Sequence, residues 1–157
     1  MSRAQVLDVV GTLARLGLAA VWLISGGIKA ADADQTYVAV DAYDVLSKSG
    51  VEVVAAILPF LEIALGLLLL VGIGTRLVVA ASILLLLVFV AGVAQAWARG
   101  LLIDCGCFGG GGAVAPGATQ YVQEILRDTG FLALAAWLVV RPSTLFSLDA
   151  RLSVGRT

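Results

Sequence analysis

The sequence of 157 residues contains no histidine, one methionine and two cysteines. Without histidine, the chain supplies no histidine ligand to haem or another metal centre, and no histidine proton relay. Two cysteines can form one intramolecular disulfide or one two-thiolate site, whereas four-cysteine zinc and iron–sulfur sites would need ligands from elsewhere. Cysteine chemistry is therefore restricted to one pair, Cys105 and Cys107.

Charged residues are also scarce. They make up 13% of the chain, and hydrophobic residues make up 61%, against about 25% and 45–50% in soluble proteins. The mean hydropathy is +1.04. Ten basic and eleven acidic residues give a net charge of −1, and no basic patch indicates a nucleic-acid partner. The composition predicts a single integral membrane domain, residues 1–157, in contact with the lipid bilayer.

Four apolar stretches are long enough to cross a bilayer, which takes about 20 residues in a helix. The predicted spans are residues 9–28, 51–73, 77–97 and 120–141. The fourth is the weakest, because Glu124, Arg127 and Asp128 precede its apolar half. The first also resembles a signal peptide, but it is longer than a typical h-region, so we expect it to be retained. The predicted fold is an all-α bundle of four transmembrane helices.

The basic residues favour an orientation with both termini in the cytoplasm. The inner side then holds six basic residues, Arg3, Arg15, Arg76, Arg141, Arg151 and Arg156. The outer side holds four, Lys29, Lys48, Arg99 and Arg127. The ratio becomes five to four when Arg15 is counted within the membrane. This orientation places the loops 29–50 and 98–119, and with them both cysteines, outside the cytoplasm.

The first outer loop, residues 29–50, is too long for a simple turn. Apolar residues recur in it at helical spacing, with charged residues available for the water-facing side: Val38, Ala42, Val45 and Leu46 against Asp41, Asp44 and Lys48. We predict a short helix on the outer surface, with an unstructured loop as the alternative.

Cys105 and Cys107 are separated by Gly106 and followed by Phe108 and four glycines. A disulfide needs a Cα separation of about 4.4–6.8 Å, which is short for residues two apart, but Gly106 can adopt the conformations required. So small a ring constrains the unfolded chain little, and strain eases its reduction. Because glycines leave the sulfurs accessible, we expect the pair to serve thiol–disulfide exchange and not to form a structural disulfide. A copper(I) site held by two thiolates, and an inert disulfide or two unpaired thiols, remain alternatives.

Three motifs carry a resemblance to a known family. Residues 15–17 (RLG) with 25–30 (SGGIKA), and residues 58–66 (LPFLEIALG), resemble the first two helices of the DoxX-like membrane proteins. Residues 104–109 (DCGCFG) narrow the resemblance to the MauE branch. It covers the chain from about residue 10 to residue 141.

The resemblance implies a four-helix membrane protein linked to disulfide chemistry, with Cys105 and Cys107 as its redox pair. MauE-type proteins assist maturation of the disulfide-rich small subunit of methylamine dehydrogenase, and are thought to work with a thioredoxin-like partner. DoxX and DoxD proteins are associated with thiosulfate:quinone oxidoreduction, which makes quinone a possible cofactor. Nothing in the sequence identifies methylamine as relevant here.

Two charged residues fall inside the predicted spans. Glu62 lies roughly 16 Å and Arg15 roughly 20 Å from the outer ends of their helices, by the helical rise per residue. Since an isolated charge there is costly, Glu62 is either a proton donor or acceptor or the partner of Arg15 in a structural ion pair. Close helix contacts are expected at the small residues Gly11, Gly17, Gly26, Gly27 and Gly66.

The leading functional hypothesis is an extracytoplasmic thiol–disulfide redox component with Cys105, Cys107 and Glu62 as its catalytic residues and no metal. Its partner would be a thioredoxin-fold or disulfide-containing substrate protein. Since the chain has no second cysteine pair, electrons would pass to a quinone or to a partner with its own cofactor. The alternative is a non-catalytic anchor or assembly subunit, covered by other membrane subunits, with a structural cysteine pair.

Overall fold

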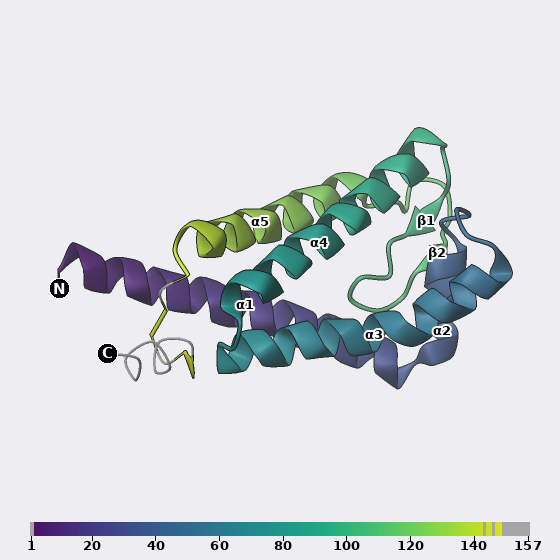
Figure 1. Cartoon of the computed structure of the whole chain (residues 1–157). Helices are drawn as coiled ribbons and strands as arrows, with labels where there is room; N and C mark the ends of the chain where they lie inside the picture. Colours follow the sequence, from purple (N-terminus) through teal and green to yellow (C-terminus); the bar gives the residue numbers. More distant parts are fainter. Residues whose placement is uncertain (1, 143, 146, 149–157) are drawn as a thin grey trace.

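The computed structural model describes residues 2–142, 144–145 and 147–148. Its helices are α1 (Arg3–Ala31), α2 (Ala33–Asp41), α3 (Lys48–Val71), α4 (Thr75–Ala98) and α5 (Tyr121–Val140). A two-stranded hairpin, β1 (Ile103–Asp104) and β2 (Gly112–Ala113), lies between α4 and α5. In Figure 1 the long helices α1, α3, α4 and α5 lie lengthwise in the molecule, and α2 and the hairpin lie at the end away from the N-terminus. The all-α prediction is confirmed.

Local signals explain where the helices begin and end. Ser2 starts α1 with a capping box, in which Gln5 N–H donates to Ser2 Oγ and Ser2 N–H donates to Gln5 Oε1. Ser47 caps α3, because its side-chain oxygen accepts a hydrogen bond from Gly50 N–H. Gly72 and Gly74 both have positive φ angles, 74° and 59°. These two glycines turn the chain from α3 into α4 within a few residues.

The bundle core is apolar and its outer surface is apolar as well. Leu18, Leu69 and Leu138 are fully buried, and Trp22 donates its indole N–H to Ser82 Oγ at 3.0 Å inside the core. Large apolar side chains also cover the outside, including Leu13, Phe60, Leu77, Leu84 and Val140. Such a surface suits lipid and not water, so the helices contact the bilayer.

Three helices, α1, α3 and α4, are long and apolar enough to cross a membrane. They contain the predicted spans 9–28, most of 51–73, and 77–97, and α1 extends beyond its prediction at both ends. Helix α5 matches the predicted segment 120–141 within a residue at each end, and its crossing of the membrane stays a prediction. Arg151 and Arg156, which enter the predicted orientation, lie outside the described residues.

The short helix predicted within residues 29–50 is confirmed as α2, but it ends at Asp41, so Val45 and Leu46 lie beyond it. Thr36 and Ala39 form its buried side. Helix α2 packs against α3 and β2. It therefore forms one wall of the region that contains both cysteines.

Candidate functional site

The segment between α4 and α5 folds into a hairpin because of its glycines. β1 and β2 pair antiparallel, with Ile103 opposite Ala113 and Asp104 opposite Gly112. Gly106 has a φ of 68°, a conformation that favours glycine. A Cβ atom there would also lie 2.7 Å from Ala39 Cβ on α2. Gly106 is therefore needed both for the turn between the cysteines and for the close approach of the hairpin to α2.

Side chains from α2 and the segment after it hold one side of the hairpin. Gln35 Nε2 donates to the carbonyl oxygens of Gly110 and Gly111 at 3.0 and 2.9 Å. The Tyr43 hydroxyl donates to the Cys105 carbonyl oxygen at 3.2 Å. Burial raises the pKa of Tyr43 well above its ordinary value, so the hydroxyl keeps its proton and stays a donor.

Helix α5 holds the other side of the hairpin. The Tyr121 hydroxyl accepts from Ile103 N–H at 3.2 Å and donates to the Leu101 carbonyl. Glu124 Oε1 accepts from Cys105 N–H at 3.3 Å, and Glu124 Oε2 has no partner among the described residues. The backbone around the first cysteine is thus fixed from α5 and from the segment that follows α2.

Both cysteines are free thiols, and their residues are only 9% and 8% exposed for Cys105 and Cys107. The prediction of sulfurs left accessible by the glycines is therefore wrong. The glycine-rich segment of the hairpin does not project away from the protein. It folds against α2, where Gly106 and Gly111 approach Ala39, and this packing covers the cysteines.

The two thiols differ in their hydrogen bonds. Cys107 N–H donates to Cys105 Sγ at 3.3 Å, and Arg127 Nη2 lies 3.7 Å from the same sulfur. The pKa of Cys105 is lowered, chiefly by the hydrogen bond from the Cys107 thiol and further by Cys107 N–H and Arg127, although burial and Glu124 oppose this. The pKa of Cys107 is raised by that same hydrogen bond and by burial. Of the two thiols, Cys105 therefore loses its proton more readily.

Arg127 is itself held in place. Its Nε lies 3.0 Å from Asp128 Oδ1, and its guanidinium lies 4.9 Å from the centre of the Phe108 ring. Phe108 packs edge-on against Phe131 at 6.4 Å. The sequence reading missed Arg127 as a site residue. Its spacing of three residues from Glu124 places both on one face of a helix, which is the signal that could have identified it.

Glu62 lies behind the hairpin in a buried network. It is fully buried, and Lys29 Nζ lies 3.0 Å from both of its carboxylate oxygens. The Ser25 hydroxyl lies 3.0 Å from Glu62 Oε2 and 2.7 Å from the Cys107 carbonyl oxygen, which Lys29 Nζ also approaches at 3.2 Å. Glu62 therefore reaches the site through the backbone of Cys107, and its predicted role in proton transfer stays a prediction.

The predicted ion pair between Arg15 and Glu62 is wrong. Arg15 Nη1 donates to the carbonyl oxygens of Leu69 and Leu70 at 2.6 and 3.0 Å, and Nη2 donates to the Leu145 carbonyl at 3.2 Å. The last carbonyls of a helix lack partners within it and attract a cation. The end of α3 therefore binds Arg15, and Lys29 pairs with Glu62 instead.

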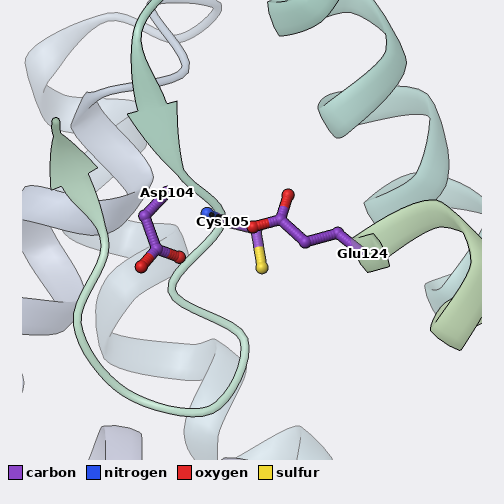
Figure 2. A group of neighbouring side chains, drawn as sticks. All are labelled: Asp104, Cys105 and Glu124. Atoms are coloured by element: carbon purple, nitrogen blue, oxygen red, sulfur yellow. Dashed lines mark hydrogen bonds between the residues drawn. The ribbon is translucent and has the colours of Figure 1, made fainter. Parts of the chain in front are cut away.

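One group of side chains has the spacing of a metal site. Figure 2 shows the carboxylates of Asp104 and Glu124 on either side of Cys105, and their ligand atoms lie within 4.8 Å of one another. Two hard carboxylates and one thiolate are not the donor set that copper(I) prefers, and Arg127 next to the sulfur adds a competing positive charge. This cluster is therefore not a copper(I) site, and the two-thiolate copper alternative at Cys105 and Cys107 stays a prediction.

Two pockets of different character border the cysteine pair. The pocket on the α5 side has a volume of about 370 Å³ and is lined by polar residues that include Gln123, Glu124 and Arg127. The pocket on the α2 side has a volume of about 230 Å³ and is lined mainly by apolar residues. Cys105 and Cys107 line both.

Fold and site together define a small helical membrane protein whose glycine-rich hairpin holds a pair of unlike thiols at one end of the bundle. Comparison with protein families matches residues 7–141 to the family described as methylamine utilisation protein MauE, and the chain belongs to that family. The resemblance indicated by the three sequence motifs is thereby confirmed. Comparisons with curated proteins and with solved structures gave no match.

Proposed function

We propose that the protein is a thiol–disulfide redox component of the membrane that works on the extracytoplasmic side. The Cys105–Cys107 pair exchanges disulfides with a thioredoxin-fold or substrate protein and so assists maturation of other proteins. The observation that supports this best is the difference between the two thiols. A pair that serves only as a brace needs no cation beside one sulfur, whereas exchange needs one thiolate and one thiol.

The reaction has two halves. In one, the Cys105–Cys107 disulfide takes two electrons and two protons from a partner dithiol, which becomes a disulfide. In the other, the reduced pair is oxidised again: the Cys105 thiolate attacks the acceptor, and Cys107 then attacks Cys105 Sγ and releases the reduced acceptor. With no second cysteine pair in the chain, the acceptor is a quinone or a partner that brings its own cofactor.

Arg127 and the network behind the hairpin support these steps. Arg127 stabilises the Cys105 thiolate from 3.7 Å. Lys29 and Ser25 hold the Cys107 carbonyl and thereby the turn that keeps the sulfurs adjacent. In this proposal Glu62 orients Lys29 and Ser25 and is the group within the bundle that can accept a proton from them.

Trapping tests the proposal. A Cys107→Ser variant keeps the attacking sulfur but has no second thiol to resolve the product, so it should accumulate mixed disulfides with its partner proteins in membranes. Cys105→Ser should accumulate far fewer, and the Cys105→Ser/Cys107→Ser protein is the control that forms none. Unchanged oxidation of a substrate protein by both single variants would reject the mechanism.

A non-catalytic anchor or assembly subunit is the second candidate, and the low exposure of both cysteines favours it. A membrane-impermeant thiol reagent separates the two candidates. In the redox component the pair reacts after reduction near cellular potentials and is protected by oxidation. In an anchor with a locked disulfide, such mild reduction leaves the pair unreactive.

A further inference from the structure

The apolar pocket beside the cysteines lies between α2, α3, α4 and the hairpin. Its apolar wall includes Val40, Leu46, Val54, Leu58, Val88 and Phe89. Two of these elements, α3 and α4, are long and apolar enough to span a membrane. The pocket therefore opens among segments that lipid surrounds, and a molecule dissolved in the bilayer can reach it.

Three polar side chains at this pocket, Lys29, Gln35 and Tyr43, already make hydrogen bonds within the protein. Lys29 is bonded to Glu62, Ser25 and the Cys107 carbonyl, and Gln35 and Tyr43 donate to backbone carbonyls of the hairpin. A polar ligand would have to compete with these bonds, whereas an apolar ring would not. The pocket thus selects an apolar occupant.

The position of the sulfurs narrows the class of that occupant. Cys105, Gly106 and Cys107 all line the pocket, so an occupant of the pocket contacts the cysteine residues even though both are buried from solvent. On the opposite side of the pair the polar pocket presents Glu124 and Arg127. A polar protein segment and an apolar small molecule can therefore approach the same two sulfurs from different sides.

We propose that the apolar pocket binds the ring of a lipid-soluble quinone and that this quinone is the acceptor which oxidises the cysteine pair. The inference rests on the proposed thiol–disulfide function and adds to it the acceptor and its binding site. The ring lies against Cys105 and Cys107 between Leu58 and Phe89, and its isoprenoid tail extends into lipid.

The step balances. The Cys105 thiolate adds to a ring carbon of the quinone and forms a C–S bond. Cys107 attacks Cys105 Sγ, the S–S bond forms and the C–S bond breaks. The two electrons of the dithiol reduce the quinone to hydroquinone, and the two thiol protons end on its two oxygens.

A pair of variants on one helix tests the site. Leu58→Trp fills the pocket, and Ile57→Trp adds the same bulk at a neighbouring position that is 59% exposed and does not line the pocket. The full-length reduced protein is mixed with decylubiquinone, and the loss of free thiols is followed. Exchange of the oxidised protein with a thioredoxin dithiol is measured in parallel, and melting temperatures confirm that each variant is folded.

Leu58→Trp should slow oxidation by decylubiquinone about tenfold or more, equivalent to about 1.4 kcal/mol, and leave thioredoxin exchange unchanged. Ile57→Trp should alter neither rate. If Leu58→Trp fails to fold, the smaller change Val54→Phe replaces it, with Val53→Phe as its exposed control.

The inference is overturned if a folded pocket-filling variant is oxidised by the quinone as fast as the wild type. It is also overturned if the wild-type dithiol exchanges with thioredoxin but does not react with decylubiquinone, and in that case the proposed function stands. Failure of the wild type to exchange with any protein dithiol or disulfide would instead reject the proposed function.

Discussion

At the scale of single residues, the environment of Cys105 differs from that of Cys107 although one glycine separates them. Cys105 Sγ receives a backbone N–H and the Arg127 guanidinium. The Cys107 backbone carbonyl instead receives Ser25 and Lys29. Hydrogen bonds thus fix Cys105 at its sulfur and Cys107 at its main chain, and the proposed exchange assigns the first attack to the Cys105 sulfur.

Replacing Arg127 with methionine should raise the pKa of Cys105, because it removes a cation that lowers this pKa. Below that pKa the thiolate fraction falls as the pKa rises, so alkylation of Cys105 near neutral pH should slow. A rise of one unit corresponds to about a tenfold lower thiolate fraction. The measurement is the rate of iodoacetamide reaction as a function of pH.

Arg99→Met, at an exposed ion pair with Asp44, is the control and should leave the profile of reaction rate against pH unchanged. An unshifted profile in the Arg127 variant would show that the cation does not act on the sulfur.

Loss of the buried Lys29–Glu62 ion pair should reduce the free energy of unfolding more than loss of a surface ion pair. Lys29→Met leaves a buried carboxylate without its cation and should reduce the free energy of unfolding by about 3–5 kcal/mol. Lys29→Met combined with Glu62→Leu should recover much of that loss. Lys48→Met removes the cation of the more exposed Lys48–Asp41 pair and should cost about 1 kcal/mol or less. Unfolding in a mild detergent with added denaturant measures all three. Equal losses for Lys29→Met and Lys48→Met would contradict the buried pairing.

Sequence reasoning located the charged residues within the bundle but not their partners. The helical rise places Arg15 and Glu62 at similar depth, yet depth is one coordinate and rotation about the helix axis is another. The structure turns Lys29 toward Glu62 and Arg15 toward the end of α3. The spacing of four residues between Ser25 and Lys29 places them on one face of α1, and this spacing could have indicated the network.

The predicted close helix contacts are confirmed at Gly26 and Gly66 and are wrong at Gly17 and Gly27. A Cβ at Gly26 would lie 2.7 Å from the Pro59 carbonyl oxygen, and one at Gly66 would lie 2.7 Å from Leu23 Cγ. Gly17 and Gly27 have nothing within 4 Å of such an atom. A glycine in an apolar helix allows a neighbouring helix to approach closely, but the rotation of the helix about its axis decides which glycine faces that neighbour.

At the scale of elements, hydropathy was sufficient for the long helices and insufficient for the hairpin. Apolar runs of about 20 residues predict helices whatever their neighbours are. β1 and β2 have two residues each, too few to show an alternating pattern. Their pairing depends on glycines at positive φ and on contacts with α2, which lies more than sixty residues earlier in the chain.

The contact between α2 and the hairpin can be tested at Gly106. Gly106→Ala places a methyl group against Ala39 and strains a positive φ angle, so it should lower the melting temperature and change the alkylation rate of the cysteines. Gly100 also has a φ of 68° but nothing within 4 Å of a Cβ, so Gly100→Ala should cost only the backbone strain of about 1–2 kcal/mol. Adding Ala39→Gly to Gly106→Ala should restore part of the loss. Without such restoration, the steric contact with α2 would not be the cause.

At the scale of the whole molecule, the chain places its N-terminus and the end of α5 at one end of the bundle and the cysteine hairpin at the other (Figure 1). The proposed orientation, with the termini in the cytoplasm, puts the hairpin outside. In a Cys105→Ser/Cys107→Ser background, Ser49→Cys should react with an impermeant maleimide in intact cells. Ser2→Cys should react only after permeabilisation. Both residues are exposed. The opposite result would reverse the orientation and leave the fold as it is.

The position of Arg15 has a consequence for the whole molecule. Its hydrogen bonds to the carbonyl oxygens of Leu69, Leu70 and Leu145 join α1, the end of α3 and the segment at Leu145, at the end far from the thiols (Figure 1). The contacts of Arg15 and the cysteine pair therefore lie at opposite ends of the protein. If the proposed exchange operates, overoxidation of the cysteines should abolish it without breaking the contacts of Arg15, so the oxidised protein should keep its fold in the bilayer.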